Sequence, residues 1–452
     1  MMVPSDHQPY RTVRQMAMKD PSLRMKQIKE TVLIRAAGVA DERGLFAGAG
    51  GLLLEIRSGG TFVGDVVEGR RSAPADRVLD LPDHLLIPGL VNAHCHLDLT
   101  SIGPVQRPAG DSFADWLQLV RTTRPQEEDS IAASVRRGIE LSLAGGVVAV
   151  GDIAGCLRSG PSLKSWQVLR SSPLRGVSFL EFFAMGLGAP ARMEAVERML
   201  AEAGPDRAML GLQPHAPYSV NLPAYERAVD LARLFDLPVC THLAETVDER
   251  MFIAEASGRQ RDFLEAIGIW DEGELAHVGH GRHPVEHLER VLARRPWLLA
   301  HVNDCSDDGI ATLVQTGASV AYCPRAHRYF GFGTSVGPHR YRVMMERGVC
   351  VCLGTDSIVN LPPGADDADL GRLSVLDEAR VLYQDDGTDA RALLAMMTTN
   401  GARALGMDQS RYRFEPGQSV AGVVAVRTGQ VDPLGELFGS GEAPRLLGVS
   451  GG

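Results

Sequence analysis

Several short apolar segments of this chain end in a histidine or an acidic residue, and the first of them carries two histidines. His94 and His96 flank Cys95 and follow the apolar lead-in LLIPGLVNA. Side chains alternate along a β-strand, so residues i and i+2 point to the same side and both imidazoles can face one metal ion. Two solvent-facing histidines would have the same spacing, but the apolar lead-in argues against exposure. The spacing therefore indicates a pair of metal ligands.

A second pair, His242 and Glu245, stands at the end of the apolar segment PVCTHLA. On a continuous strand, residues i and i+3 face opposite sides, so Glu245 is expected beyond the strand end, where the chain turns. This arrangement gives one ligand and one nearby carboxylate that is suited to general acid/base work beside a metal-activated water. The same spacing is also common on helices, so the pair alone does not exclude a helix.

Three further polar residues follow apolar segments in the same way. Asp356 comes after VCLGT, and because an unpartnered buried carboxylate is costly, it is expected to be ligated or hydrogen-bonded. Its alternative role is to cap the N-terminus of the next segment, and its position does not separate the two. His215 in QPHAPYS and His301 in AHVND would each, taken alone, be an ordinary buried histidine. The joint pattern favours one metal site.

The elements that would bring these residues together are short β-type runs that alternate with longer amphipathic stretches, as in a parallel α/β fold. Eight runs can be counted, which is the number of strands in a closed (β/α)8 barrel, or TIM barrel. The carboxyl ends of all barrel strands meet at one face, so residues far apart in sequence would converge there. The runs span residues 90–96, 147–153, 176–182, 209–215, 238–244, 298–304, 319–325 and 351–357.

The predicted barrel, residues 88–407, has β-rich sequence on both sides. Residues 30–87 contain short apolar pieces separated by glycines, which is typical of hairpins. Residues 408–452 include another β-type stretch, and we expect the two flanks to pair in one small composite β domain. Residues 1–29 are polar and rather basic, and we expect them to form a disordered tail.

Composition excludes several classes of protein. The net charge of −10 argues against a nucleic-acid partner held through its phosphates. Seven scattered cysteines without a CxxC pair indicate reduced thiols rather than a disulfide framework or a zinc knuckle. No segment has the ~20 apolar residues of a membrane span or the apolar core of a secretory signal. We therefore expect a soluble, cytoplasmic protein with neither a nucleic-acid nor a membrane partner.

Four motifs together carry a resemblance to a known family. PGLVNAHCHLDL, THLAET, CPRAH and LGTDS occur in this order, and over about residues 30–430 the chain resembles the amidohydrolase superfamily. It is most similar to the mononuclear deaminase and chlorohydrolase branch, which includes adenosylhomocysteine, guanine and aminofutalosine deaminases and triazine hydrolases. The resemblance implies a metal-dependent hydrolase that acts on non-peptide carbon–nitrogen bonds.

The resemblance also implies a role for each residue by its position. Glu245 would be the acid/base that moves protons, His301 would orient the attacking water, and Asp356 would take a proton from it. His215 would contact the substrate; binuclear members have a carboxylated lysine on this fourth strand, so His215 favours a mononuclear site. The residues assigned to the metal ion are His94, His96, His242 and Asp356.

The expected substrate pocket is less sharply defined. Trp116, Arg325, His327 and Tyr329 follow the first and seventh strands and are expected to shape it, although ordinary loop packing would explain them equally well. CPRAHRYFG is closer to aminofutalosine-deaminase-like members than to guanine deaminases. Two departures are an insertion, PPGADDADLG, beside the expected substrate region and Ala421-Gly422-Val423 at a turn that usually reads Ala-Asp-Leu.

The sequence therefore predicts hydrolytic deamination of an aminopurine-type, adenosine-like small molecule with release of ammonia. One divalent ion, Zn²⁺ before Fe²⁺, is the implied cofactor, and a homodimer is the implied assembly. A chlorohydrolase or cyclic amidase of the same family is the alternative. A non-catalytic barrel would have lost ligands, and none is missing; a cytidine-deaminase-type enzyme would need the PCxxC motif that this chain lacks.

Overall fold

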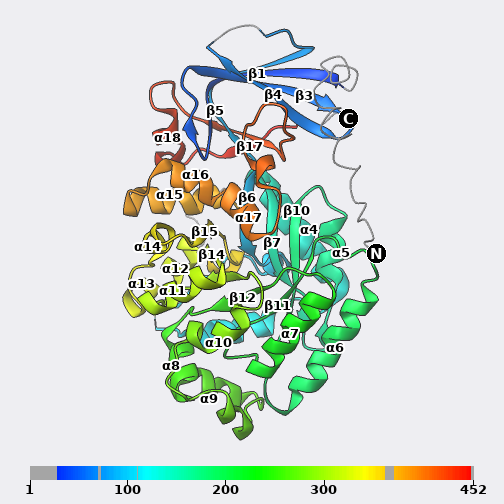
Figure 1. Cartoon of the computed structure of the whole chain (residues 1–452), viewed down its shortest axis with the longest axis vertical. Coiled ribbons are helices and arrows are strands. Elements are labelled where there is room, and N and C mark those ends of the chain that lie inside the picture. The colour runs from blue at the N-terminus through cyan, green and yellow to red at the C-terminus, as the bar shows by residue number, and fades with distance from the viewer. Residues whose placement is uncertain (1–27, 70–72, 109, 362–370, 449–452) are drawn as a thin grey trace, which may run out of the picture.

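The computed structural model describes residues 28–69, 73–108, 110–361 and 371–448. They form two parts: a barrel of parallel strands wrapped by helices, and a β-sheet that lies over one end of the barrel (Figure 1).

Eight parallel strands build the barrel, which confirms the expected (β/α)8 fold. They are β6 (Leu90–Cys95), β7 (Val147–Ala154), β10 (Arg175–Phe182), β11 (Leu210–Pro214), β12 (Cys240–Leu243), β13 (Leu298–His301), β14 (Ser319–Tyr322) and β15 (Cys350–Leu353). They form two four-stranded sheets, β11–β10–β7–β6 and β12–β13–β14–β15. Parallel bridges between Leu212 and Val239 and between Cys95 and Asp356 join the sheets at both seams, so the barrel is closed.

Helices follow the strands and cover the outside of the barrel. Nearly every barrel-strand residue is buried, as expected for a parallel sheet covered on both faces. The helices are α3 (Phe113–Thr123), α4 (Glu128–Ala144), α5 (Lys164–Arg170), α6 (Ala189–Glu202), α7 (Leu222–Leu234), α8 (Val247–Glu255), α9 (Arg259–Ala266), α10 (Pro284–Leu292), α11 (Asp307–Thr316), α12 (Pro324–Phe330), α13 (Phe332–Ser335), α14 (Tyr341–Glu346), α15 (Val375–Asp386), α16 (Ala390–Met396), α17 (Thr399–Ala404) and α18 (Pro433–Gly439).

Local sequence sets where these helices begin and end. In α11, the side chain of Ser306 accepts a hydrogen bond from Gly309 N, and Gly317 closes the helix with a left-handed φ of 66°, as N-cap and C-cap preferences predict. The helical sequence at 389–407 forms two helices rather than one. Thr398, with φ −133° and ψ −93°, breaks it between α16 and α17.

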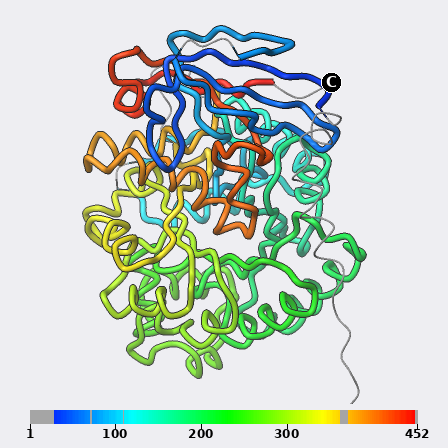
Figure 2. Tube along the Cα trace, turned by 45° about the horizontal axis from the view of Figure 1, so that its top comes forward, coloured from blue at the N-terminus to red at the C-terminus, as the bar shows by residue number. Residues whose placement is uncertain are grey.

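The N- and C-terminal segments share the second sheet, as expected. Its strands are β1 (Ile28–Asp41), β2 (Gly44–Leu45), β3 (Ala49–Arg57), β4 (Gly60–Glu68), β5 (Arg77–Pro88), β16 (Val423–Arg427) and β17 (Pro444–Leu446). The order is β17–β16–β5–β1–β3–β4, with β2 paired to β1. β5 joins the two segments, because it runs parallel to β1 and antiparallel to β16. In Figures 1 and 2 the blue and red ends of the chain accordingly lie together.

The remaining predictions concern the N-terminal tail, the insertion after β15 and the domain boundaries. The predicted tail lies outside the described residues except for Ile28 and Lys29, which begin β1, so the prediction was wrong for these two. The insertion at 362–371 also lies outside them apart from Gly371. Domain boundaries at 30, 88 and 408 stay a prediction.

All seven cysteines are free. Among the described residues, no helix is long and apolar enough to cross a membrane.

The remaining regular elements are short. They are the hairpin β8 (Cys156–Leu157) and β9 (Gly160–Pro161), and the 3-10 turns η1 (Leu97–Ile102), η2 (Gly186–Gly188), η3 (Glu272–Ala276), η4 (Ile358–Asn360) and η6 (Gln409–Tyr412).

Candidate metal centre and active site

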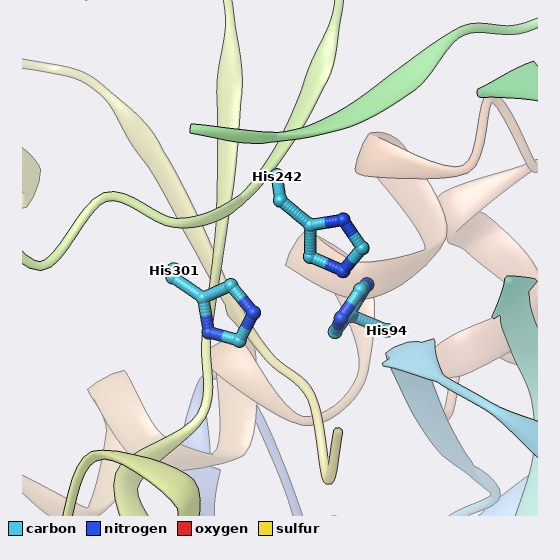
Figure 3. Close-up of side chains that lie close together, drawn as sticks. All are labelled: His94, His242 and His301. Atoms are coloured by element: carbon cyan, nitrogen blue, oxygen red, sulfur yellow. The ribbon is translucent and has the colours of Figure 1, made fainter. Parts of the chain in front are cut away.

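Four side chains from three strand ends meet at the mouth of the barrel. Oδ1 of Asp356 lies 3.6 Å from Nε2 of His94 and 3.4 Å from Nε2 of His96. The ring of His242 lies 5.0 Å from that of His94, centroid to centroid, and 5.5 Å from that of His96. The convergence expected from the strand positions is therefore present, and Figure 3 shows the rings of His94, His242 and His301 turned toward a common space.

The competing interpretations of single motifs are excluded by burial and secondary structure. The side chain of His94 is fully buried, so the HxH pair is not solvent-facing. His242 lies on strand β12 rather than on a helix, and Glu245 lies two residues beyond its end. Ser357, not Asp356, caps the turn that follows β15, because its side chain accepts from Val359 N.

Left-handed backbone conformations mark the strand ends that carry the site. Ala244, His301 and Asp356 have φ values of 51°, 70° and 53°. Such conformations cost roughly 1–3 kcal/mol each in residues other than glycine, and they persist where surrounding structure fixes them. They turn the chain sharply after β12, β13 and β15, so that side chains at the strand ends face the barrel mouth.

The donor set fits a divalent metal ion. Both ring nitrogens of His94 and Nδ1 of His96 are buried and have no hydrogen-bond partner among the described residues. Nδ1 of His242 lies 3.0 Å from the carbonyl oxygen of His215 and 3.0 Å from Nε2 of Gln213, so the protein contacts hold this ring through Nδ1 and leave Nε2 for a metal ion. Three imidazoles and one carboxylate are ligands that Zn²⁺ and similar ions take, and a ring hydrogen bond of this kind typically orients a ligand.

The ionisation of the carboxylate and its neighbours agrees with this fit. Burial alone would raise the pKa of Asp356, but contacts with His94 and His96 outweigh it and hold that pKa well below its usual value. Burial lowers the pKa of His94, and burial together with neighbouring histidines lowers the pKa of His242 well below its usual value. An anionic carboxylate and neutral imidazoles are the forms that bind metal.

Glu245 stands beside this cluster as a separate carboxyl group. Its Oε1 lies 3.5 Å from Nε2 of His301. Two side chains fix its backbone: Glu249 accepts hydrogen bonds from the N–H groups of Ala244 and Glu245, both at 2.8 Å, and Asn303 donates to the carbonyl oxygen of Glu245. Burial, followed by repulsion from Asp356 and Glu249, raises the pKa of Glu245 well above its usual value. The group therefore favours its protonated form.

His301 lies between Glu245 and the metal-binding residues. Its ring centroid is 5.2 Å from that of His94 and 5.4 Å from that of His242. Nε2 of His339 donates to its carbonyl oxygen at 2.8 Å, which holds the turn after β13. Burial lowers the pKa of His301 to about 3 despite the nearby Asp356, so the imidazole is neutral near pH 7.

These groups open into a cavity of about 590 Å³. Its floor contains His96, His242, Glu245, His301 and Asp356, and His215 lines it above β11. Its walls are largely aromatic and aliphatic. The aromatic wall residues are Phe113, Trp116, Phe182, Phe183, Tyr218, Phe263 and Trp270.

The predicted pocket residues divide into two groups. Trp116 lines the cavity from α3, as expected. Arg325 and His327 do not line it, which corrects the expectation for both. Arg325 turns instead to Glu378, to which its Nε donates at 2.5 Å, and His327 packs edge-on against the ring of Tyr322. Both residues belong to α12, which packs against the neighbouring helix α15.

Tyr329 is likewise absent from the cavity lining. Its hydroxyl donates a hydrogen bond to the carbonyl oxygen of Val105 at 2.8 Å. This bond holds the loop after β6, and the hydroxyl does not face the cavity.

Arg124 and Glu181, which line the cavity, and their buried neighbour Asp98 were not assigned a role from the sequence. Arg124 donates from Nη1 to Oε2 of Glu181 and from Nη2 to Oδ2 of Asp98, both at 2.8 Å. Burial alone would raise the pKa of Glu181, but Arg124 and His215 lower it to about 2. Glu181 ends an otherwise apolar run, GVSFLEF, which was a usable signal. Arg124 ends α3 with no comparable local signal.

Asn360 is another supporting residue that the sequence did not reveal. Its Nδ2 donates to Oδ2 of Asp356 at 2.5 Å. This bond uses the carboxylate oxygen that does not face His94 and His96, so it orients Asp356 in the way that outer hydrogen bonds orient metal-binding carboxylates.

The sequence profile of the amidohydrolase family matches residues 85–433 of the chain. A similar protein, the 5-methylthioadenosine/S-adenosylhomocysteine deaminase of Natronomonas pharaonis, is 28% identical over 374 residues, which cover 80% of this chain and 76% of the relative.

Two solved structures have a similar fold. One is an adenosine deaminase from Xanthomonas campestris with bound zinc, with a TM-score of 0.64 at 20% identity over 91% of this chain and 89% of the other. The second is the aminofutalosine deaminase of Helicobacter pylori in complex with methylthio-coformycin, with a TM-score of 0.69 at 19% identity over 92% and 98% of the two chains.

Proposed function

Because the chain belongs to the amidohydrolase family, we propose that it hydrolyses a carbon–nitrogen bond, removing the amino group of an aminopurine-type, adenosine-like substrate as ammonia. The observation that carries the proposal is the placement of Glu245, a carboxyl group that favours its protonated form, beside the cluster of His94, His96, His242 and Asp356. The similar deaminase of Natronomonas pharaonis supports the aminopurine class.

The proposed cofactor is one divalent ion, Zn²⁺ before Fe²⁺, held by the four residues named above. When bound, the ion would supply Lewis acidity and lower the pKa of water toward ~7. Asp356 is anionic, and the lowered pKa values of His94 and His242 favour their neutral, metal-binding forms. Contacts with Asp356 outweigh burial and raise the pKa of His96, so this ring would release its proton when the ion binds. The bound zinc in the Xanthomonas campestris adenosine deaminase favours zinc over iron.

Two carboxyl groups divide the proton transfers. The attacking water forms a bond to the ring carbon that bears the amino group, and Asp356 accepts the proton that this water loses. Glu245 donates a proton to the adjacent ring nitrogen, so negative charge does not accumulate there. Asp356 passes the proton taken from the water to the amino nitrogen, the carbon–nitrogen bond breaks and ammonia leaves. The proton of the new hydroxyl group returns to Glu245 as the ring carbonyl forms. His301, neutral and 3.5 Å from Glu245, would orient the water.

The cavity supports a planar, largely apolar ligand. Its volume of about 590 Å³ lies in the range of roughly 300–1,000 Å³ that is usual for small-molecule sites. Phe113 and Trp116, whose rings stack with their centroids 5.7 Å apart, both line the cavity and make this wall aromatic. We propose that this wall and His215 contact the substrate.

The alternative within the family is release of chloride or opening of a cyclic amide, because the same residues would activate water and protonate a ring nitrogen. A screen of the metal-loaded protein separates these possibilities. We expect ammonia release from aminopurines or their nucleosides. Chloride release from chlorinated triazines, or hydrolysis of cyclic amides, without ammonia from any aminopurine would contradict the proposal.

The setting of the protein is also proposed. Seven free thiols favour a reducing compartment, and we propose the cytoplasm. The proposed assembly is a homodimer, which light scattering of the purified protein measures directly.

A further inference from the structure

The carboxylate of Glu181, on the cavity wall at the end of β10, has one oxygen occupied and one available. Arg124 binds Oε2 at 2.8 Å, and the same guanidinium is held by Asp98. Within the described part of the chain, Oε1 has no hydrogen-bond donor, and Nε2 of His215 lies 4.0 Å away from it. Glu181 lines the cavity, so Oε1 is an acceptor that a ligand can reach.

His215 offers a second acceptor next to the first. The hydroxyl of Ser219 donates its single hydrogen to the carbonyl oxygen of Ala216 at 3.1 Å. Both this bond and the contact of 2.7 Å between the hydroxyl and Nδ1 of His215 are satisfied when Nδ1 carries the ring hydrogen and donates it to the hydroxyl oxygen. In the neutral imidazole, Nε2 then carries a lone pair. Its distance of 4.0 Å from Oε1 of Glu181 is too long for a hydrogen bond.

Two acceptors side by side select the groups that can bind between them. A carboxylate, phosphate or carbonyl oxygen would place lone pairs against lone pairs. A single hydroxyl would satisfy only one of the two acceptors, whereas an amino group has two N–H donors. Because Arg124 keeps Glu181 charged, a hydrogen bond to Oε1 belongs to the stronger, charge-assisted kind.

The position of the pair places this group close to the reacting atom. One ligand atom each from Glu181, His215 and His242 lie within 4.8 Å of one another, and His242 also belongs to the metal site. An amino group held here would lie beside the metal-binding residues, where the proposed function places the reacting ring. Resting on the proposed function, we propose that Glu181 and His215 form a double-acceptor subsite that binds an amino group of the substrate's ring.

The test measures ligand binding in a metal-loaded Glu245→Gln background, where turnover is suppressed. Titration calorimetry gives the Kd of adenosine, 6-chloropurine riboside and 2,6-diaminopurine riboside with Glu181 intact and after Glu181→Gln. Comparing the Kd of adenosine with that of 6-chloropurine riboside tests whether the subsite binds the amino group that leaves. Comparing the Kd of 2,6-diaminopurine riboside with that of adenosine tests whether it binds a second amino group on the ring. In one pair we expect the additional amino group to tighten binding about tenfold or more, and Glu181→Gln to reduce this to about twofold or less.

Two further variants separate the subsite from general damage. Ser219→Ala frees Nδ1 of His215, so its hydrogen can move to Nε2; it should reduce the amino preference severalfold and leave the Kd of the 6-chloro compound unchanged. Glu202→Gln, which removes an exposed charge on α6, should change neither the amino preference nor the Kd of the 6-chloro compound. An amino preference unaffected by Glu181→Gln, or no preference in either pair, overturns the subsite while the proposed function stands. Absence of binding by all three ribosides overturns both.

Discussion

The backbone N–H of Asp356 donates a hydrogen bond to the carbonyl oxygen of His94, with an N···O distance of 3.1 Å. The bond joins the end of β15, the last barrel strand, to β6, the first. Closure of the barrel and assembly of the metal-binding side chains therefore occur at the same place. The backbone bond needs no side chain of residue 356, so fold and ligation can be separated by mutation.

Asp356→Asn should keep the fold and lose the metal. The variant retains the N–H that bonds to His94, but its amide is a far weaker ligand than an anionic carboxylate. We expect metal content to fall from about one equivalent to well below half, with activity reduced at least about 100-fold. Metal analysis and circular dichroism check both parts. Asp308→Asn, an exposed aspartate on α11, is the matched control, and full metal content in Asp356→Asn would contradict the ligand assignment.

Gly354→Ala should disturb the same junction from the backbone side. A Cβ at this position would lie 2.8 Å from both Cβ and the carbonyl oxygen of His94, so β6 and β15 would have to separate. We expect a loss of roughly 1–3 kcal/mol of stability, as for other overpacked sites, together with weaker metal binding. Urea unfolding and metal titration measure the two effects. Gly371→Ala meets nothing within 4 Å and should behave like the parent protein.

The sequence predicted the residues whose position along a strand determines where they point. His94, His242 and Asp356 end apolar runs, and a closed parallel barrel brings such ends together whatever the intervening helices do. Arg325 follows the seventh strand equally closely, yet it pairs with Glu378 on α15. Its direction depends on how α12 packs, and sequence periodicity contains no information about that packing. The direction of Arg124 likewise depends on how the end of α3 packs, so the sequence did not predict its contacts.

Glu245→Gln should retain the metal and lose most of the activity. The glutamine amide keeps the size of the side chain and the backbone bonds from Ala244 and Glu245 to Glu249, but it has no proton to transfer. General acid/base groups contribute about 10²–10⁴-fold, so we expect a fall in kcat of that size with about one equivalent of metal bound. Glu346→Gln, an exposed residue at the end of α14, is the control. Undiminished kcat would remove Glu245 from the mechanism.

The pH dependence of kcat/KM should have an alkaline limb that belongs to Glu245. Burial and the neighbouring acids raise the pKa of this carboxyl group, and it acts in its protonated form. Activity should therefore be retained below the raised pKa and fall as the pH rises through it. Glu249→Gln removes one of the neighbouring acids that raise it, so we expect the limb to move to lower pH. A limb at the same pH in that variant would assign it to another group.

Arg124→Met should destabilise the protein and flatten its response to acid. The substitution leaves Glu181 and Asp98 buried without their cation, and breaking a buried ion pair from one side costs roughly 3–5 kcal/mol.

In the parent protein, the pKa of Glu181 is about 2 against an ordinary 4.5, so its contribution to stability is complete above pH 4.5 and disappears as the pH falls toward 2. Without Arg124 the pKa of Glu181 loses the strongest of the interactions that lower it, and most of this part of the acid loss should vanish. Urea midpoints of the metal-free proteins between pH 6 and 2 measure both effects, since metal release then does not contribute. Arg137→Met, whose exposed pair with Glu140 contributes at most ~0.5 kcal/mol, should follow the parent curve. Identical acid curves for Arg124→Met and the parent would show that the ion pair with Glu181 does not control acid stability.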